Sequence, residues 1–549
     1  MTNVLEYLEH SARVCPDKTA LIDPNGTCTY AQLEECSRAV GSALAGYTAP
    51  GAPVVIWMEK SIPAVSAFMG CVYAGCFYVY LSPNQPKNRG ERILSVAQAR
   101  LVITTRELLP KWQELGLGGD VLLYEDLAAQ RADNARLAAI RARSRDVDPL
   151  YCNFTSGSTG TPKGVVVSHR SVIDFMNFFP ELFGITGEDV LGNQAPFDFD
   201  VSVKDLYSAF KTGATLVLIP RRMFSVVTEL LDYLCEHRVT TLIWAVSALC
   251  LVAQFRGFTY KVPESVNKVL FSGEQMPAKF LSQWQHYLPK ASFVNLYGPT
   301  EITCNCTYYR VDHPVEEGEK LPIGQSFPNE RVFLLDGEDH EVTEPNVQGE
   351  LCVSGTALAL GYWNAPEQTA KAFVPDPLNP HYPETIYRTG DLAFYREDGL
   401  LSFAGRKDFQ IKHMGHRIEL EEIETAVNSE AGVGRCCCVY DQERSRITAF
   451  YVGEPEPREL KKSLYEQLPA YMIPGSFRKL DELPVTANGK LDRRLLLDMA
   501  GGEKRIRLSF NRRSKPCPPR FMCLIPMRRQ KKWCVCAVCS RSECSCAMP

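Results

Sequence analysis

The sequence predicts an α/β protein in which a large N-terminal domain of layered α/β sheets, with a small β subdomain, is hinged to a small α+β C-terminal domain. Three observations support this fold class. The chain has 549 residues, more than a single hydrophobic core accommodates. Helix-like and strand-like patterns alternate from residue 1 to about residue 405, as in largely parallel sheets between helices. From residue 406 the pattern changes to a strand, a turn, an amphipathic helix and further strands.

Short apolar runs are the expected strands of the N-terminal domain, residues 1–405, and amphipathic stretches such as 227–238 are the expected helices between them. The apolar run 65–81 is shorter than the roughly 20 residues of a membrane span and contains glycines. We expect its first half to be a buried helix and its end a strand. The other expected strands are residues 54–58, 101–104, 121–124, 215–219 and 241–244.

The C-terminal domain is expected to span residues 406–500. Residues 411–430 predict a strand, a turn at Gly415 and an amphipathic helix. Residues 436–440, which contain three consecutive cysteines, and residues 447–453 predict two further strands.

Composition and charge bear on the partners and the cellular compartment of the protein. The net charge of -4 gives no sign of a nucleic-acid partner. The first 23 residues lack the unbroken apolar core of a signal peptide, so despite 21 cysteines we expect a reducing, cytoplasmic environment.

The tail, residues 501–549, is rich in cysteine, lysine and arginine. Its cysteine spacing matches no zinc pattern, and a disordered basic tail is expected.

The loop TSGSTGTPKG, residues 155–164, has the composition of a phosphate-binding loop. Its glycines let backbone N–H groups converge on an anion, and its hydroxyls and lysine add donors and charge. It is not a Walker A loop, because Pro162 and Gly164 replace the required glycine and hydroxyl residue. A flexible solvent loop is the alternative. The candidate phosphate ligands are Thr155, Ser156, Gly157, Ser158, Thr159, Gly160 and Lys163.

Other short motifs carry groups that suit a nucleotide. In NLYGPTE, residues 295–301, Tyr297 offers a flat face to a purine, and Glu301 offers oxygens to Mg²⁺. In YRTGDLA, Asp391 follows a turn glycine and can accept both hydroxyls of a ribose. Arg406 can reach a phosphate or ribose, and PVTANGKLDRR places Lys490 on an Asn-Gly turn. Each motif alone is weak, but together in this order they are specific.

This set of motifs resembles that of the adenylate-forming enzymes, which include acyl-CoA synthetases, luciferases and the adenylation domains of nonribosomal peptide synthesis. The resemblance covers residues 1 to about 497, includes AGCFYVYLSP at residues 74–83 and leaves out the tail. Within the superfamily, NQAPFDFDVSVKDLY, GRKDFQIK and PVTANGKLDRR are most similar to the D-alanine–D-alanyl carrier protein ligases.

The resemblance implies two half-reactions with ATP and Mg²⁺. A carboxylate attacks the α-phosphate of ATP and releases pyrophosphate, and the phosphopantetheine thiol of a carrier protein then takes the acyl group. The resemblance implies that Lys490 is catalytic and bridges the carboxylate and the α-phosphate, and that Glu301 binds Mg²⁺. Besides the loop residues, it implies as nucleotide contacts Asn295, Leu296, Tyr297, Gly298, Pro299, Thr300, Asp391, Phe403 and Arg406.

The resemblance also implies that Asp200 pairs with the α-ammonium group of an amino acid. The pocket is expected to be lined by Lys204, Ser272 and Cys304, together with Ile243, Leu270 and Leu296. Ser272 replaces a cysteine typical of the D-alanine subgroup, and a buried Lys204 needs a partner. If that partner is a substrate carboxylate, glutamate or aspartate is favoured. If it is Asp198 or Asp205, the pocket stays small and D-alanine is favoured.

The resemblance also implies a rotation of the C-terminal domain about Asp408. Lys412 and Gly415 then face the site for thiol transfer, and Gly415 lets the pantetheine arm pass. We expect the carrier protein to act in trans, and we expect no membrane span. The alternatives are an acyl-CoA synthetase, which Asp200 disfavours, and a nucleotide sensor without chemistry, which has no need of Lys490.

Overall fold

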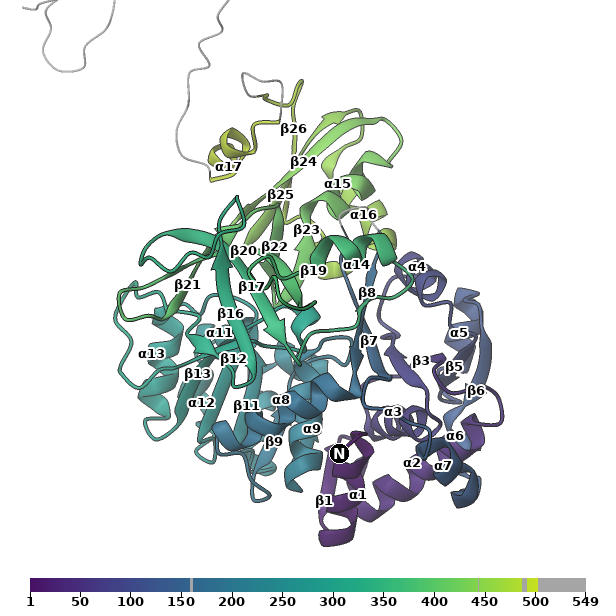
Figure 1. The fold of residues 1–549 in the computed structure, drawn as a ribbon. Coiled ribbons are helices and arrows are strands. Elements are labelled where there is room, and N and C mark those ends of the chain that lie inside the picture. Colours follow the sequence, from purple (N-terminus) through teal and green to yellow (C-terminus); the bar gives the residue numbers. More distant parts are fainter. Residues whose placement is uncertain (158–160, 443, 486–490, 502–549) are drawn as a thin grey trace, which may run out of the picture. The chain divides into compact units, whose positions relative to one another are not determined.

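The computed structural model describes residues 1–157, 161–442, 444–485 and 491–501, drawn in colour in Figure 1. The predicted site residues Ser158, Thr159, Gly160 and Lys490, and the tail from residue 502, lie outside the described residues. The described part confirms the predicted fold class. Large α/β sheets form its N-terminal portion, and a smaller α+β portion follows.

The first large sheet carries the predicted amino-acid residues and residues 295–301 at or next to the ends of its strands. Its central strands β13, β12, β11, β9, β10 and β1 are parallel, and β15, β14 and β2 are antiparallel at its two ends. Ligand-binding residues gather where parallel strands end. The strands in spatial order are β15 (Gln325–Ser326), β14 (Thr307–Arg310), β13 (Ser292–Tyr297), β12 (Lys268–Ser272), β11 (Thr241–Ala245), β9 (Val190–Asn193), β10 (Thr215–Leu218), β1 (Thr19–Asp23) and β2 (Gly26–Thr29).

The second large sheet carries the predicted phosphate loop. Strands β7 and β8 are antiparallel and enclose that loop. On its other side β7 is parallel to β4, and β4, β3, β5 and β6 are parallel to one another. Its strands in spatial order are β18 (Gly361–Tyr362), β8 (Lys163–Ser168), β7 (Pro149–Thr155), β4 (Phe77–Tyr80), β3 (Pro53–Ile56), β5 (Leu101–Thr104) and β6 (Asp120–Leu123).

Helices join and cover the two sheets. The largest apolar cluster contains residues from both sheets and from helices between them, such as Phe68, Phe175 and Tyr207. The helices of this portion are α1 (Leu5–Val14), α2 (Tyr30–Leu44), α3 (Ile62–Tyr73), α4 (Lys87–Ala97), α5 (Leu109–Leu115), α6 (Tyr124–Ala128), α7 (Asn134–Arg141), α8 (His169–Leu182), α9 (Val201–Thr212), η1 (Arg221–Ser225), α10 (Val227–Glu236), α11 (Val246–Gln254), α12 (Gly257–Tyr260), α13 (Ala278–Tyr287) and η2 (Thr300–Ile302).

The apolar run 65–81 divides as predicted, into helix α3 and strand β4. Helix α3 crosses α2 closely, because a Cβ on Gly41 would lie only 2.5 Å from Tyr73 Cβ. In the part of the chain that the structure describes, no helix is both long and apolar enough to cross a membrane.

A smaller sheet of β16 (Glu330–Leu335), β17 (Gln348–Gly355), β20 (Thr385–Tyr395), β19 (Phe373–Pro375) and β21 (Leu401–Arg406) follows, with helix α14 (Pro366–Ala372). It is the small β subdomain that the sequence predicts. It carries Asp391 on β20 and Arg406 at the end of β21, and these two residues lie opposite each other in the strand register.

The C-terminal portion begins with a two-stranded hairpin and continues into a three-stranded sheet. The three consecutive cysteines are buried in β24, as predicted. Its elements are β22 (Gln410–His413), β23 (His416–Glu419), α15 (Leu420–Asn428), β24 (Val433–Asp441), β25 (Arg446–Gly453), α16 (Pro457–Gln467), η3 (Ala470–Met472), β26 (Ser476–Lys479) and α17 (Arg493–Gly501).

Candidate active site

The phosphate loop connects β7 and β8, and Thr155 pairs with Lys163 where the two strands end. A Cβ on Gly157 would lie 2.1 Å from the carbonyl oxygen of Thr161, so the chain turns back at a position that only glycine fits. Ser156 is buried, and its hydroxyl donates a 2.7 Å hydrogen bond to the carbonyl oxygen of Arg417. The loop therefore touches the C-terminal portion directly.

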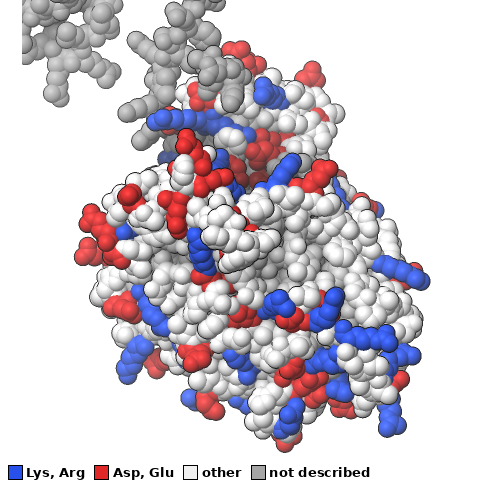
Figure 2. Space-filling view, viewed as in Figure 1, with Lys and Arg blue, Asp and Glu red and all other residues white. Residues whose placement is uncertain are grey.

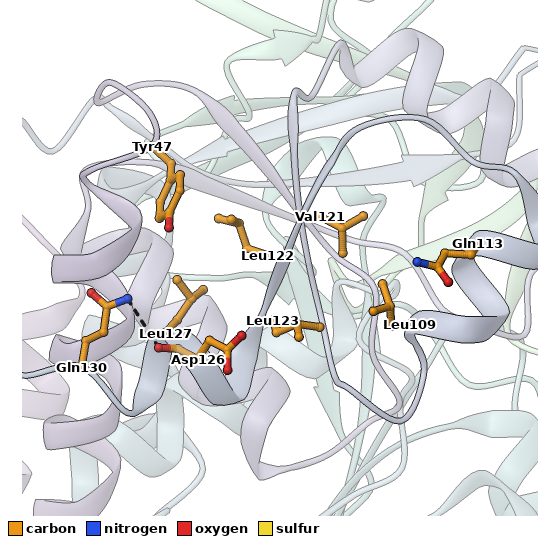
Figure 3. Close-up of a pocket in the computed structure, with 9 residues that line it drawn as sticks. All are labelled: Tyr47, Leu109, Gln113, Val121, Leu122, Leu123, Asp126, Leu127 and Gln130. Carbon is orange, nitrogen blue, oxygen red and sulfur yellow. Dashed lines mark hydrogen bonds between the residues drawn. The ribbon is translucent and has the colours of Figure 1, made fainter.

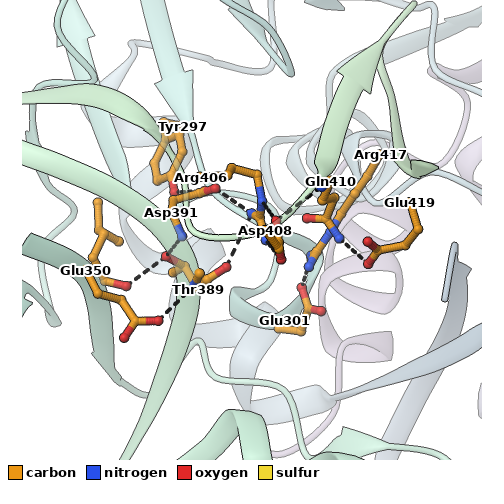
Figure 4. A network of polar contacts seen from close by, with 12 residues as sticks. Tyr297, Glu301, Glu350, Thr389, Asp391, Arg406, Asp408, Gln410, Arg417 and Glu419 are labelled. Atoms are coloured by element: carbon orange, nitrogen blue, oxygen red, sulfur yellow. Dashed lines mark hydrogen bonds and ion pairs between the residues drawn. The ribbon is translucent and has the colours of Figure 1, made fainter. Parts of the chain in front are cut away.

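The predicted purine and ribose residues form one polar network, shown in Figure 4. Tyr297, at the end of β13, donates its hydroxyl hydrogen bond to Asp391. Arg406 forms an ion pair with Asp391 and also holds both carboxylate oxygens of Asp408, at 2.5 and 2.7 Å. Phe403 lies near Tyr297, with ring centroids 6.4 Å apart. The predicted hinge residue Asp408 is thus linked through Arg406 to the predicted ribose ligand.

The other predicted nucleotide residues lie around the end of β13. Leu296 is buried in the core, and the side-chain amide of Asn295 donates to the carbonyl oxygen of Pro322, at 2.8 Å. A Cβ on Gly298 would lie 2.4 Å from Asn305 Cα, so this glycine permits a close approach of two backbone segments. Pro299 precedes η2, in which Thr300 makes a side-chain hydrogen bond with Asp200.

Glu301, the predicted Mg²⁺ ligand, is only 1% exposed and pairs with a residue of the hairpin β22–β23. Its Oε2 accepts from Nη1 of Arg417 at 2.7 Å, and its Oε1 accepts from the Tyr362 hydroxyl at 2.8 Å. Burial acts to raise the pKa of Glu301, but Arg417 and the hydroxyl outweigh it, and the net shift is downward. An ionised, buried carboxylate whose partner is a cation also fits a divalent cation in that position.

The predicted amino-acid pocket lies at the start of helix α9. Asp200 precedes that helix, and burial raises the pKa of its carboxyl group. The Cys304 thiol contacts the carbonyl oxygen of Asp200 at 3.1 Å. Cys304 also belongs to the apolar cluster that contains the predicted lining residues Ile243, Leu270 and Leu296. Ser272, at the end of β12, is buried as well.

Lys204 has a partner that the sequence did not suggest. The side chain is fully buried, and its Nζ donates a 2.6 Å hydrogen bond to Oδ1 of Asn305. Burial lowers the pKa of Lys204, while the charges of nearby groups, including Asp200 and Asp205, oppose that shift. Asp198 accepts from Gln85, and burial raises the pKa of Asp205 to about 7. Asn305 was missed because positive φ values at Thr303 (52°) and Cys304 (79°) redirect the chain there.

The hairpin β22–β23 contacts the predicted nucleotide residues. Lys412 Nζ lies 5.1 Å from the centre of the Tyr297 ring. The N–H of Gly415 donates to the carboxylate of Glu274. Arg417 and Glu274 were both missed by sequence reasoning. For Arg417 a signal existed, because it lies opposite Lys412 in the register and paired residues share one face of a hairpin.

A separate pocket of about 400 Å³ lies on the outer part of the second sheet, near β6, α5 and α6 (Figure 3). None of its lining residues is a predicted site residue. In Figure 2, acidic and basic side chains are intermixed on the visible face, and no broad basic patch is apparent among the residues that are described there.

Comparison with known proteins identifies the family. Residues 8–363 match the model of the AMP-binding enzymes, and residues 422–490 match the model of the AMP-binding enzyme C-terminal domain. Zwittermicin A synthase ZmaJ from Bacillus cereus is 34% identical over 517 residues, which are 92% of this chain and 96% of ZmaJ. Tyrocidine synthase 1 from Brevibacillus parabrevis is 30% identical over 503 residues, and the match spans 90% of this chain but only 45% of that synthase.

The fold is shared with solved structures as well. Holo-PA1221, an NRPS protein containing adenylation and PCP domains, superimposes with a TM-score of 0.76 at 25% identity, over 91% of this chain and 84% of PA1221. The family match covers more than half of the chain, and the match with ZmaJ covers nearly all of both proteins. The chain therefore belongs to the AMP-binding enzymes, the adenylate-forming superfamily.

Proposed function

We propose that this protein activates an amino acid, with D-alanine as the leading candidate, as an aminoacyl-adenylate and transfers it to the phosphopantetheine thiol of a carrier protein. One observation carries the proposal. Asp200, suited to an ammonium group, is hydrogen-bonded to Thr300, and Lys412, whose Nζ lies 5.1 Å from the centre of the Tyr297 ring, is close enough to feel the charges of both Asp200 and Asp391. A single site thus offers groups for an amino acid and for a nucleotide.

In the first half-reaction, the amino-acid carboxylate attacks the α-phosphate of ATP, the phosphoanhydride bond breaks, and pyrophosphate leaves. Two anions meet in this step, so cations and N–H donors have to converge on them. We assign that role to the loop 155–164, and to Lys490, which would bridge the carboxylate and the α-phosphate. Asp391 would accept the ribose hydroxyls after Arg406 and Tyr297 release it.

Glu301 would hold Mg²⁺, which supplies charge neutralisation on the phosphate oxygens when it is bound. In the structure the same carboxylate oxygen that suits a metal faces Arg417 of the hairpin. We propose that Arg417 takes this position after pyrophosphate has left, so that Glu301 keeps a cationic partner in both half-reactions.

In the second half-reaction, the thiol loses its proton to solvent, the sulfur attacks the adenylate carbonyl carbon, a C–S bond forms, the bond to phosphate breaks, and AMP leaves. The arrangement of the hairpin is consistent with this half-reaction. Lys412 and Gly415, which the resemblance assigns to thiol transfer, both face the N-terminal portion. The matched relative PA1221 contains a PCP domain beside its adenylation domain. We propose that a carrier protein with a phosphopantetheine arm is likewise the acceptor for this chain.

The contacts of Lys204 favour a small substrate. Its Nζ is bound by Asn305 and lies near the charges of Asp205 and Asp200, so it needs no substrate carboxylate as a partner. Glutamate or aspartate remains the second candidate, since Asn305 is neutral and could yield Lys204 to an acidic side chain. Asp200 disfavours acyl-CoA synthesis, because acids without an ammonium group give it nothing to pair with.

The test is the exchange of labelled pyrophosphate into ATP, measured with each of the twenty L-amino acids, D-alanine and D-glutamate. We expect amino-acid-dependent exchange, strongest with D-alanine. Exchange with an acidic amino acid alone would select the second candidate. No exchange with any of these amino acids would favour the nucleotide sensor and reject the proposed reaction.

A further inference from the structure

The turn of the hairpin β22–β23 rests on the loop that follows β12. Met414 and Gly415 both have positive φ values, 54° and 79°, as in the two-residue turns that suit the twist of a hairpin. The N–H of Gly415 donates a 2.5 Å hydrogen bond to Oε1 of Glu274. This bond joins the turn of the C-terminal portion to the end of a central strand of the first large sheet.

The loop that carries Glu274 begins at the paired ends of two strands, which form its base. Ser272 is the last residue of β12 and pairs with Ala245 on β11, so both strands end at the same level. Gly273, at φ 100°, and Glu274 continue directly from there. Because Ser272 is in the predicted amino-acid pocket, the position of Glu274 is fixed relative to that pocket.

The turn fits this base closely. A Cβ on Gly415 would lie 3.2 Å from the Cβ of Ala245 and 3.5 Å from Oγ of Ser247. A Cβ on Gly273 would lie 3.8 Å from Gly415 Cα, so two glycines face each other across the contact. The turn of the hairpin therefore packs directly against the ends of β11 and β12, with Gly415 at the point of contact.

Glu274 is half-buried, and its hydrogen-bond partner Gly415 lies in the C-terminal portion, which the resemblance implies rotates between the two half-reactions. Burial raises the pKa of Glu274, and this effect outweighs the opposite effects of the Gly415 N–H and of the charge of Lys412. A partly buried carboxylate is stabilised by such a donor, and the donor arrives only when the hairpin docks.

We propose that Glu274 is a positioning residue for thiol transfer, because it receives the turn of the hairpin and sets the depth at which Lys412 covers Tyr297 and Arg417 reaches Glu301. This inference rests on the proposed function. Glu274 acts only in the second half-reaction, through the backbone of Gly415, and takes no proton from the thiol.

The experiment compares three variants of the full chain in both half-reactions. Thiol transfer is measured with phosphopantetheine as the acceptor, using the amino acid that gives the highest exchange and pyrophosphatase to remove pyrophosphate. Glu274→Ala is expected to lower kcat for transfer about 10- to 100-fold, the factor that a charge-assisted hydrogen bond carries. ATP–pyrophosphate exchange and KM for ATP should stay within about twofold, which also shows that the variant is folded.

Glu274→Gln is expected to restore most of the transfer rate, because its amide oxygen accepts the same N–H. Gln275→Ala, at the exposed neighbouring residue, is the matched control and should behave as the wild type. Unchanged transfer in Glu274→Ala would overturn the inference. A Glu274→Gln variant as slow as Glu274→Ala would also overturn it, because the carboxylate would then act as a base. If the wild type showed no exchange at all, the proposed function would fail instead.

Discussion

Replacing Arg417 with alanine should separate the two half-reactions. The Arg417–Glu301 ion pair has an N–O distance of 2.7 Å, with side chains that are 18% and 1% exposed. Without the guanidinium, Glu301 keeps hydroxyl partners but no cation in the docked state. Removing one member of a buried pair costs about 3–5 kcal/mol. Because the hydroxyls remain and the hairpin can withdraw, we take the lower limit of about 3 kcal/mol, which corresponds to roughly 100-fold.

The penalty falls on the docked state alone, so it should appear in thiol transfer and not in adenylation. In single-turnover assays we expect Arg417→Ala to form the thioester about 100-fold more slowly, with ATP–pyrophosphate exchange within threefold of the wild type. Arg417→Lys, which keeps the charge without the guanidinium geometry, should lie between the two. Equal losses in both half-reactions, or unchanged thiol transfer, would refute the assignment of Arg417 to the second state.

Three further predictions follow from individual residues. Lys490→Ala should lower exchange by orders of magnitude with a much smaller effect on ATP affinity measured by calorimetry, and an unchanged exchange rate would mean that its role is misassigned. Lys204→Met should leave Oδ1 of Asn305 without its donor and destabilise the fold by about 1–3 kcal/mol in urea unfolding, while the preference for a small amino acid persists. Selective loss of exchange with acidic amino acids would instead place Lys204 on the substrate. Burial lowers the pKa of His169 from 6.5 to about 4, so the unfolded chain binds the extra proton in this interval and stability must fall as the pH falls. Between pH 7.5 and 5.5 we expect His169 to account for a loss of about 1.4 kcal/mol, which His169→Gln should abolish; an equal pH dependence in the variant would contradict this.

Much of the fold could be predicted because its strands are short, apolar and bounded by polar turns. Residues 241–244 and 101–104 coincide with β11 and β5 to within one residue, and the helix expected at 227–238 is α10. The limits shift where propensity is ambiguous. Tyr124, expected at the end of a strand, is the first residue of helix α6.

The candidate site was predictable where a motif lies on one segment, and less so where two segments meet. The partner of Lys204 is 101 residues away, and Asn305 reaches it only through the left-handed backbone at Thr303 and Cys304. Glu274 and Gly415 are 141 residues apart, and no local pattern connects them. Such contacts depend on packing between distant segments, which a single sequence does not encode as a visible spacing.

The most direct test of the whole account is whether the substrate must carry an ammonium group. Pyrophosphate exchange is measured with D-alanine and with propionate, which differ only in that group, on the wild type and on Asp200→Ala. We predict that D-alanine exceeds propionate by about 100-fold or more in the wild type, and that Asp200→Ala removes the difference by losing activity with D-alanine. Equal exchange with propionate in the wild type would contradict the central claim that this site activates amino acids.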